Sequence, residues 1–359
     1  MASKHYKIAA IPGDGIGGEV LPVGQAIVDR VAALCDFTVS WQAFDWSCQR
    51  YADTGQMMPH DGVEQMKDFD AIFLGAVGWP TVADHVSLWN LLIPLRRELD
   101  QYANVRPVRL LKGIESPLAG RTPDEIDFVV VRENVEGEYS EIGGRMYGGT
   151  ENEQVSQLTV FTRQGVDRIL KYAFELCQNR SRKVLTSATK SNGIMHTMPY
   201  WDERFSLMAE QYPGISTNQF HIDILTAHFV QHPDWFDVVV GSNLFGDILS
   251  DLGPAVAGSI GIAPAANINP EGKYPSMFEP VHGSAPDIAG QGIANPIAAV
   301  WTAAMMLQHL GEIEAEALIM QAIENTLVNP DARTIDLGGS ASTRDCEQAL
   351  LSAIDGMDS

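Results

Sequence analysis

Two patterns of apolar and polar positions alternate along this chain. Short runs rich in valine, isoleucine and aromatic residues predict buried strands, and segments with apolar residues every three or four positions predict amphipathic helices. The predicted strands cover residues 7–11, 37–43, 71–76, 128–132, 155–162, 183–187, 219–225 and 238–241. The predicted helices cover residues 18–35, 297–310 and 312–328. Strands that alternate with helices in this way are typical of an α/β fold.

The stretch from residue 137 to residue 149 departs from this pattern. It contains two glycine pairs, at 143–144 and 148–149, and then enters a β-rich run. Glycine pairs favour turns, so we expect a hairpin arm here rather than core structure. No serine- or proline-rich linker divides the chain. Its domains are therefore expected to be interleaved in sequence.

The charge balance narrows the class of protein. The 359 residues include 46 acidic and 24 basic side chains, for a formal net charge of −22. A chain this acidic, without basic stripes, is not expected to bind nucleic acid or an anionic membrane surface. No apolar run reaches the roughly 20 residues of a membrane-spanning helix. We expect no signal peptide, because the chain runs directly into a strand pattern.

The cysteines indicate a reducing compartment. They are Cys35, Cys48, Cys177 and Cys346. Their wide spacing favours buried free thiols over a disulfide framework or a structural zinc site. This distribution fits a cytoplasmic protein.

A glycine-rich turn follows the first predicted strand. Gly13, Gly15 and Gly18 satisfy G-x-G-x-x-G and open the first predicted helix, which is the position of a dinucleotide fingerprint in a Rossmann domain. However, Pro12 stiffens the turn, and Asp14 would present a negative charge to a pyrophosphate. From these residues alone, a Rossmann site and a tight strand-to-helix turn both stay open.

Three aspartates are candidate ligands for a cation. Asp247 and Asp251 are four residues apart, which places both carboxylates on one face of a helix. Asp223 lies in another β-rich run, 219–225, and could supply a third carboxylate. Carboxylate oxygens suit Mg²⁺ or Mn²⁺, although a solvated acidic face would show the same pattern.

Three arginines form a second candidate set. Arg106 precedes a proline and is therefore expected in extended backbone, and Arg132 closes an apolar strand. Together with Arg96 they suggest a small polycarboxylate as ligand, because the guanidinium fork binds carboxylates bidentately. Each one alone is more typical of a surface ion pair. Tyr139, which follows Arg132 in the same segment, is a candidate proton donor.

Two loops complete the candidate chemistry. Lys190 lies between a strand and a helix, and a buried lysine beside a metal can have a lowered pKa and act as a base. A surface lysine stays the alternative. The loop 282–290 combines His282, which can stack on a planar ring, with small residues and Asp287, which can accept from ribose hydroxyls. By chemistry alone this segment is a loop with ligand potential.

These motifs occur together in the order and spacing of one family. Over nearly its whole length the chain resembles the metal-dependent β-decarboxylating dehydrogenases, which include isopropylmalate and isocitrate dehydrogenases. The matching segments are 11–17, 96–109, 131–134, 189–192, 243–251 and 282–290. The resemblance implies an α/β, isopropylmalate dehydrogenase-like two-domain fold with a mixed sheet, not a Rossmann fold. It implies a cofactor-side domain of residues 1–102 plus 259–359 and a central substrate and dimerisation domain of residues 103–258, with a β arm near 137–162.

The resemblance also implies roles for the candidate residues. Arginines would hold the substrate carboxylates, aspartates would hold Mg²⁺ or Mn²⁺, and a lysine–tyrosine pair would move protons. These residues are Arg96, Arg106 and Arg132 for substrate, Asp223, Asp247 and Asp251 for metal, and Lys190 and Tyr139 for catalysis. The active site would be shared across a homodimer, with Lys190 and Asp223 supplied by the other subunit.

The implied cofactor is NAD, because relatives that prefer NADP carry lysine at the position of Asp287. The implied cofactor-binding residues are Ile11, His282, Gly283, Ser284, Ala285, Asp287 and Asn295. Activation by K⁺ stays open.

Within the family, segments 87–89 and 101–106 are most similar to the branch that oxidises tartrate and D-malate. Leu92 keeps an apolar position before the first arginine, and Asn90 could hydrogen-bond a short diacid. Trp89 could shorten the pocket, and Pro94 starts or kinks a helix just before Arg96.

We therefore expect NAD- and Mg²⁺- or Mn²⁺-dependent oxidation and β-decarboxylation of a short 2-hydroxy diacid. D-malate, converted to pyruvate and CO₂, and tartrate are the expected substrates, with 3-isopropylmalate as the alternative. Two other classes remain: a metal-free Rossmann oxidoreductase and a catalytically silent NAD-binding paralogue.

Overall fold

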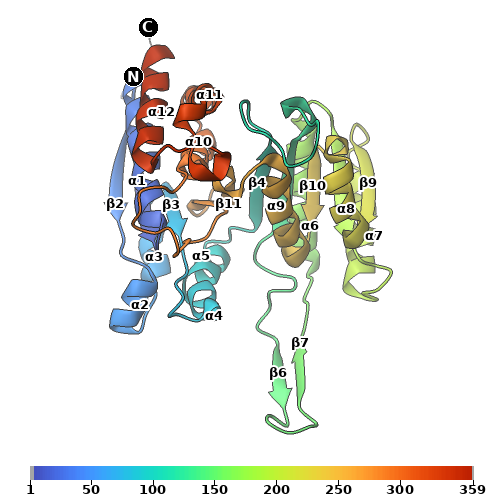
Figure 1. The fold of residues 1–359 in the computed structure, drawn as a ribbon. Coiled ribbons are helices and arrows are strands. Elements are labelled where there is room, and N and C mark those ends of the chain that lie inside the picture. Colours follow the sequence, from blue (N-terminus) through green and yellow to red (C-terminus); the bar gives the residue numbers. More distant parts are fainter. Residues whose placement is uncertain (1–3, 358–359) are drawn as a thin grey trace.

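A computed structural model describes residues 4–357 of the chain, and one large mixed sheet runs through it (Figure 1). Within these residues ten strands pair in the order β2-β1-β3-β12-β11-β4-β5-β10-β8-β9. The neighbours at either end of the sheet are parallel, and the pairs β12–β11, β11–β4 and β4–β5 at its centre are antiparallel. The strands of the sheet are β1 (Lys4–Gly13), β2 (Phe37–Ala43), β3 (Ala71–Ala76), β4 (Ala103–Arg109), β5 (Asp127–Glu133), β8 (Val184–Thr189), β9 (Ser216–His221), β10 (Val238–Gly241), β11 (Pro264–Ile268) and β12 (Ser276–Pro280).

Helices cover both faces of the sheet. Beside its N-terminal strands, alternate residues face two apolar clusters: Ile8 and Phe73 pack with α1 and α10, and Ile11 and Leu74 pack on the opposite side with the segment around Leu95. This alternation follows from the two-residue period of a strand. The helices are α1 (Gly17–Leu34), α2 (Cys48–Thr54), α3 (Gly62–Met66), α4 (Asp84–Ser87), α5 (Ile93–Glu98), α6 (Arg163–Gln178), α7 (Thr197–Ala209), α8 (Ile222–Gln231), α9 (Asn243–Ala257), α10 (Ile297–His309), α11 (Ile313–Val328) and α12 (Thr343–Met357).

The chain enters and leaves on the same side of the molecule (Figure 1). Of the strands in the first 76 residues, β3 pairs with β12, and β11 joins β12 to β4 and the strands of the central part of the chain. The α/β class and the mixed sheet are as expected. The domain boundaries near residues 102 and 258 stay a prediction, because the strands on either side belong to one continuous sheet.

An extended hairpin projects from the body of the molecule (Figure 1). Its strands, β6 (Gly143–Met146) and β7 (Gln154–Gln157), pair antiparallel, in the stretch where the glycine pairs predicted an arm. The predicted strand over 155–162 was too long, because β7 ends at Gln157. Large apolar side chains are exposed along the arm: Ile142, Met146, Tyr147, Val155 and Leu158. A cluster of exposed apolar side chains is typical of an interaction surface.

The structure corrects one prediction that bears on the site. The run 219–225 is not a single strand, because β9 ends at His221 and α8 begins at Ile222. Asp223 therefore lies in the first turn of a helix, where the helix dipole favours a carboxylate. Strands β4, β11 and β12 were also missed by the hydrophobic pattern.

The segment before Arg96 shows how the chain accommodates Pro94. A π-helical turn, Leu88–Leu92, precedes α5, and Pro94 lies within the first two positions of that helix. The backbone is continuously helical from Asp84 to Glu98, and the π-helical turn directly before Pro94 is the local adjustment beside the missing proline N–H. Arg96 therefore lies on a regular helix and is buried.

No helix between residues 4 and 357 combines the length and the apolar character needed to span a lipid bilayer. The four cysteines are free thiols, as their spacing predicted.

Candidate active site

A carboxylate, a guanidinium and a phenol meet where β5 and α9 approach each other. Strand β5 carries the buried Arg132, and α9 carries Asp247 one turn from its start. Asp247 accepts from Arg132 Nη1 through Oδ1 and from the Tyr139 hydroxyl through Oδ2, the latter at 2.7 Å. Arg132 also donates from Nε and Nη2 to Asn243, which fixes the guanidinium. The structure thus brings together three of the side chains that the sequence analysis singled out.

Arg106 adds a second buried cation to the same group. It lies on β4, donates to Asn104 at 2.8 Å and Ser250 at 2.7 Å, and has its Nη2 atom 3.6 Å from Asp247. Its Nη1 atom lies 3.5 Å from Asp251, whose side chain is 62% exposed. The one-turn spacing of the two aspartates therefore places both carboxylates within reach of Arg106.

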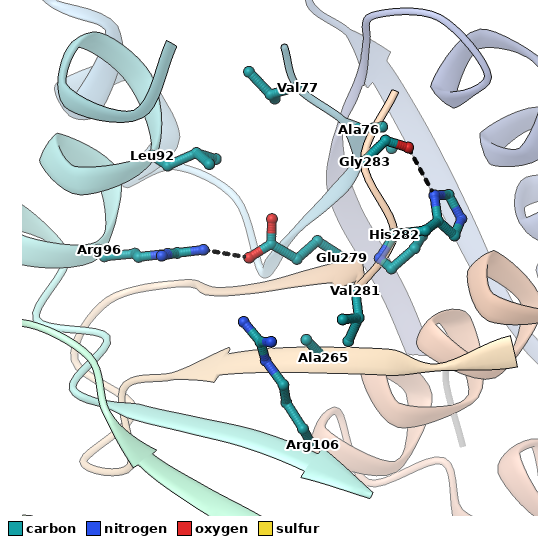
Figure 2. A pocket seen from close by; sticks show the side chains of 12 residues that line it. Ala76, Val77, Leu92, Arg96, Arg106, Ala265, Glu279, Val281, His282 and Gly283 are labelled. Carbon is teal, nitrogen blue, oxygen red and sulfur yellow. Dashed lines mark hydrogen bonds and ion pairs between the residues drawn. The ribbon is translucent and has the colours of Figure 1, made fainter. Parts of the chain in front are cut away.

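Arg96 and Arg106 line a cavity of about 140 Å³ (Figure 2). Leu92 lies on its wall, and Arg96 donates to Glu279 at 2.7 Å. On the opposite side the cavity is closed by His282 and Gly283. Residues predicted for substrate and for cofactor thus share one cavity.

The charges around Asp247 set the protonation of the cluster. Burial opposes ionisation of Asp247, but Arg132 and Arg106 outweigh it and hold the pKa of this carboxyl below its usual value. Burial raises the pKa of Tyr139, and the Asp247 carboxylate adds to the rise. Burial also lowers the pKa of Arg132, to about 10. The cluster is therefore a phenol that keeps its proton beside an ionised carboxylate.

Glu279 is a functional candidate that the sequence reasoning missed. Its carboxylate is buried and accepts from Arg96 and, at 2.8 Å, from Asn267. Burial disfavours its charge, but Arg96 and Asn267 hold the pKa of Glu279 below its usual value. The signal was a lone acid in the apolar segment 276–281, three residues before His282.

Lys190 and Asp223 form a separate pair. Lys190 follows the end of β8, and its Nζ lies 2.6 Å from Asp223 at the start of α8. This hydrogen bond holds the pKa of Asp223 below its usual value. Between residues 4 and 357 no group of three or more His, Cys, Asp or Glu side chains is arranged to hold a metal ion. One copy of the chain therefore does not bring Asp223 together with Asp247 and Asp251.

The glycine turn is covered by the loop that carries the predicted cofactor residues. Ile16 N donates to the Ser284 carbonyl at 2.9 Å, and a Cβ on Gly15 would lie 2.1 Å from that oxygen. The Asp14 carboxylate is occupied by the backbone N–H groups of Cys48 and Gly78. The strand-to-helix turn is thus the correct interpretation of the fingerprint, because Ser284 occupies the approach to Gly15.

Two further features concern the loop 282–290, which carries most of the predicted cofactor residues and is called the cofactor loop below. Glu19, on α1, accepts from the backbone of Gly290 and Gly292 and anchors the end of the loop; sequence reasoning gave it no role. His282 is buried with its Nδ1 near the Gly283 carbonyl, and its Nε2 has no partner. A buried imidazole nitrogen without a partner fits a ligand that supplies a hydrogen bond or a stacking face.

The other residues predicted to bind cofactor or substrate differ in burial and in their hydrogen-bond partners. Ile11 is buried in β1, and Asp287 is exposed on the cofactor loop. Asn295 is bonded internally, to Asp336 and to the backbone at the start of α10. Ala285 has a positive φ of 40°. Asn90 is exposed and lies with Trp89 at a different cavity from the one that Leu92 and Arg96 line.

Glu133, next to Arg132, predicts a pH dependence of stability. Burial raises the pKa of its carboxyl to about 7. Because the folded pKa exceeds the unfolded one, Glu133 contributes its full stability below pH ~4.5 and loses it as the pH rises through ~7, by roughly 3 kcal/mol. In Glu133→Gln this loss should disappear, because an amide does not ionise in this pH range. The amide oxygen can still accept from Val135 N. Urea unfolding of wild type and Glu133→Gln at pH 5 and pH 8 measures the change in the free energy of unfolding between the two pH values. An equal change in both proteins would contradict the assignment.

Comparisons with known proteins identify the family of the chain. The chain belongs to the isocitrate/isopropylmalate dehydrogenase family, whose sequence profile matches residues 7–350. The fold is similar to that of isocitrate dehydrogenase from Methylococcus capsulatus, with a TM-score of 0.88 and 31% identity over 97% of this chain and 99% of the other. The resemblance inferred from the motifs is thereby confirmed.

Two curated relatives are more similar in sequence. D-malate dehydrogenase (decarboxylating) from Escherichia coli strain K12 is 58% identical over 98% of this chain and 99% of its own length. Tartrate dehydrogenase/decarboxylase from Pseudomonas putida is 54% identical over the whole of both chains.

Proposed function

We propose that this protein oxidises and decarboxylates a short 2-hydroxy diacid, with D-malate and tartrate as substrates, NAD⁺ as oxidant and Mg²⁺ or Mn²⁺ as metal. The observation that carries the proposal is the buried cluster of Arg96, Arg106 and Arg132 beside the aspartate pair. Three guanidinium groups provide sites for two carboxylates in a protein with a net charge of −22. The family and the names of the relatives support the same chemistry.

The side chains present fit the groups that the reaction needs. Asp247 and Asp251 offer hard carboxylate oxygens to a divalent cation, and His282, which lines the cavity, has a buried Nε2 without a hydrogen-bond partner. A bound Mg²⁺ or Mn²⁺ would supply Lewis acidity at the 2-hydroxyl, and NAD⁺ would accept the hydride. Asp287, exposed on the cofactor loop, would repel a 2′-phosphate and so favour NAD over NADP.

The chain's own residues bind the substrate and transfer its protons. The arginines bind both carboxylates and set the orientation of the substrate. Lys190 Nζ accepts the proton of the 2-hydroxyl as hydride leaves the adjacent carbon. After CO₂ departs, the Tyr139 hydroxyl, kept protonated at Asp247, returns a proton to the carbon that carried it.

We also propose that the active unit is a homodimer. Lys190 and Asp223 are paired away from Asp247 and Asp251, so a second copy must bring a lysine and a third carboxylate to each aspartate pair. The apolar side chains exposed on the β6–β7 arm offer a surface for that copy. A cytoplasmic location, supported by the spacing of the cysteines, is a further part of the proposal. Activation by K⁺ is another part, and it rests on the resemblance alone.

A substrate panel tests the function directly. Reduction of NAD⁺ with Mn²⁺ should be fastest with D-malate or with L- or meso-tartrate, and slower with 3-isopropylmalate and isocitrate. EDTA should abolish the activity and added Mn²⁺ should restore it, because the hydroxyl proton is not lost readily without the metal. A strong preference for 3-isopropylmalate would overturn the substrate assignment. Full activity in EDTA would instead favour a metal-free oxidoreductase.

A further inference from the structure

The loop that carries Tyr139 has no regular structure of its own. Residues 134–142 connect β5 to the arm without forming helix or a regular strand. Backbone pairing of Gly137 with Val160 and of Ile142 with Leu158 holds the two ends of this segment, and between them side chains bind the backbone next to Tyr139. Arg97 is one of these: its Nη2 donates to the Tyr139 carbonyl at 2.6 Å and its Nε to the Val135 carbonyl at 3.3 Å.

Arg97 is itself held in place. Its guanidinium lies over the ring of Trp89, 5.1 Å from the centroid. Trp89 belongs to the π-helical turn directly before α5, so its backbone is continuous with the helix that carries Arg97. A third contact, from Nη1 to Glu141 at 3.1 Å, reaches a carboxylate that is 70% exposed. Such an exposed ion pair contributes little, and the two backbone contacts are therefore the functional ones.

The far end of Tyr139 is fixed as well. Its hydroxyl donates to Asp247, and the Arg132 guanidinium lies 5.4 Å from its ring centroid. With the backbone held at one end and the hydroxyl at the other, the ring keeps one orientation. Release of the backbone would let the hydroxyl move away from Asp247.

We propose that Arg97, supported by Trp89, is a positioning residue that ties the loop of Tyr139 to the helix that carries Arg96. The two arginines are neighbours in α5, but Arg96 faces the cavity and Glu279, whereas Arg97 faces the loop. The helix that binds a substrate carboxylate therefore also sets the place of the tyrosine. This inference rests on the proposed function only in giving Tyr139 a proton to transfer.

Kinetics of three variants test the role of Arg97. In Arg97→Ala, kcat for D-malate oxidation should fall about 10- to 100-fold, the effect of losing charge-assisted hydrogen bonds that position a proton donor. KM for D-malate should change less than about threefold, since Arg96 stays intact. Arg97→Lys keeps the positive charge but loses the planar guanidinium group with its several donors, so its kcat should lie between those of wild type and Arg97→Ala. The matched control, Glu141→Gln, removes only the exposed contact and should stay within about twofold of wild type.

A double-mutant cycle separates positioning from general damage. If Arg97 acts through Tyr139, then Arg97→Ala should reduce kcat little further in a Tyr139→Phe background. Additive losses in the double variant would overturn the proposal, as would a change confined to KM.

Hydrogen exchange provides a readout that does not depend on activity. Backbone amides in residues 134–142 should exchange about tenfold faster in Arg97→Ala than in wild type or Glu141→Gln. Unchanged exchange in this segment would overturn the inference. A wild-type protein that oxidises none of the diacids would contradict the proposed function alone, because the exchange experiment would still decide whether Arg97 anchors the loop.

Discussion

Hybrid dimers assembled from Lys190→Ala and Asp247→Asn protomers are expected to be active, although each variant alone is not. Either substitution should lower kcat/KM about 10³-fold, in the range expected for loss of a proton acceptor or of a metal ligand. Lys190 is paired with Asp223 and is separate from the Asp247 cluster within one chain. If each site takes Lys190 from the second subunit, one of the two sites in a hybrid is intact.

The expected recovery can be calculated from the symmetry of the dimer. Random mixing makes half of the dimers hybrids, and one site of each hybrid works, so the mixture should regain about a quarter of wild-type activity. Co-expression followed by an NAD⁺ reduction assay measures it. A mixture of Lys190→Ala with Asp223→Asn is the matched control and should stay inactive, because both residues are supplied by the same subunit. Failure of the first mixture to recover would place a complete site within one chain.

Gly15→Ala is expected to destabilise the protein by about 3 kcal/mol and to weaken NADH binding. Gly15 has a φ of +55°, and a Cβ there would meet the Ser284 carbonyl at 2.1 Å, so the cofactor loop must move. Gly18→Ala is the control: it lies in α1 with nothing within 4 Å of an added Cβ, and alanine should change stability by less than about 1 kcal/mol in the favourable direction.

Urea unfolding and NADH fluorescence titration of both variants measure these two effects. Gly18→Ala is a suitable control because alanine is tolerated at the third position even of a Rossmann fingerprint. Retention of binding in Gly18→Ala and its loss in Gly15→Ala is the result that the present fold requires.

The regular parts of the fold were predictable because their apolar side chains form unbroken runs in the strands and a regular spacing in the helices. Strands β2, β3 and β10 begin and end where the apolar runs do, and the helices over 17–34 and 297–309 were predicted to within one residue at each end. Strands β4, β11 and β12 were missed for a physical reason. They hold Asn104, Arg106, Asn267 and Glu279, which bond one another inside the sheet and interrupt the hydrophobic pattern.

The sequence by itself determined the α/β class, the family, the one-turn spacing of Asp247 and Asp251, and the three arginines, because these depend on residue type and local spacing. Only the tertiary structure decided which groups meet. It paired Arg96 with Glu279, covered Gly15 with Ser284 and kept Asp223 with Lys190. These contacts join segments between 33 and 269 residues apart, and spacing along a chain carries no information about partners brought together by strand order.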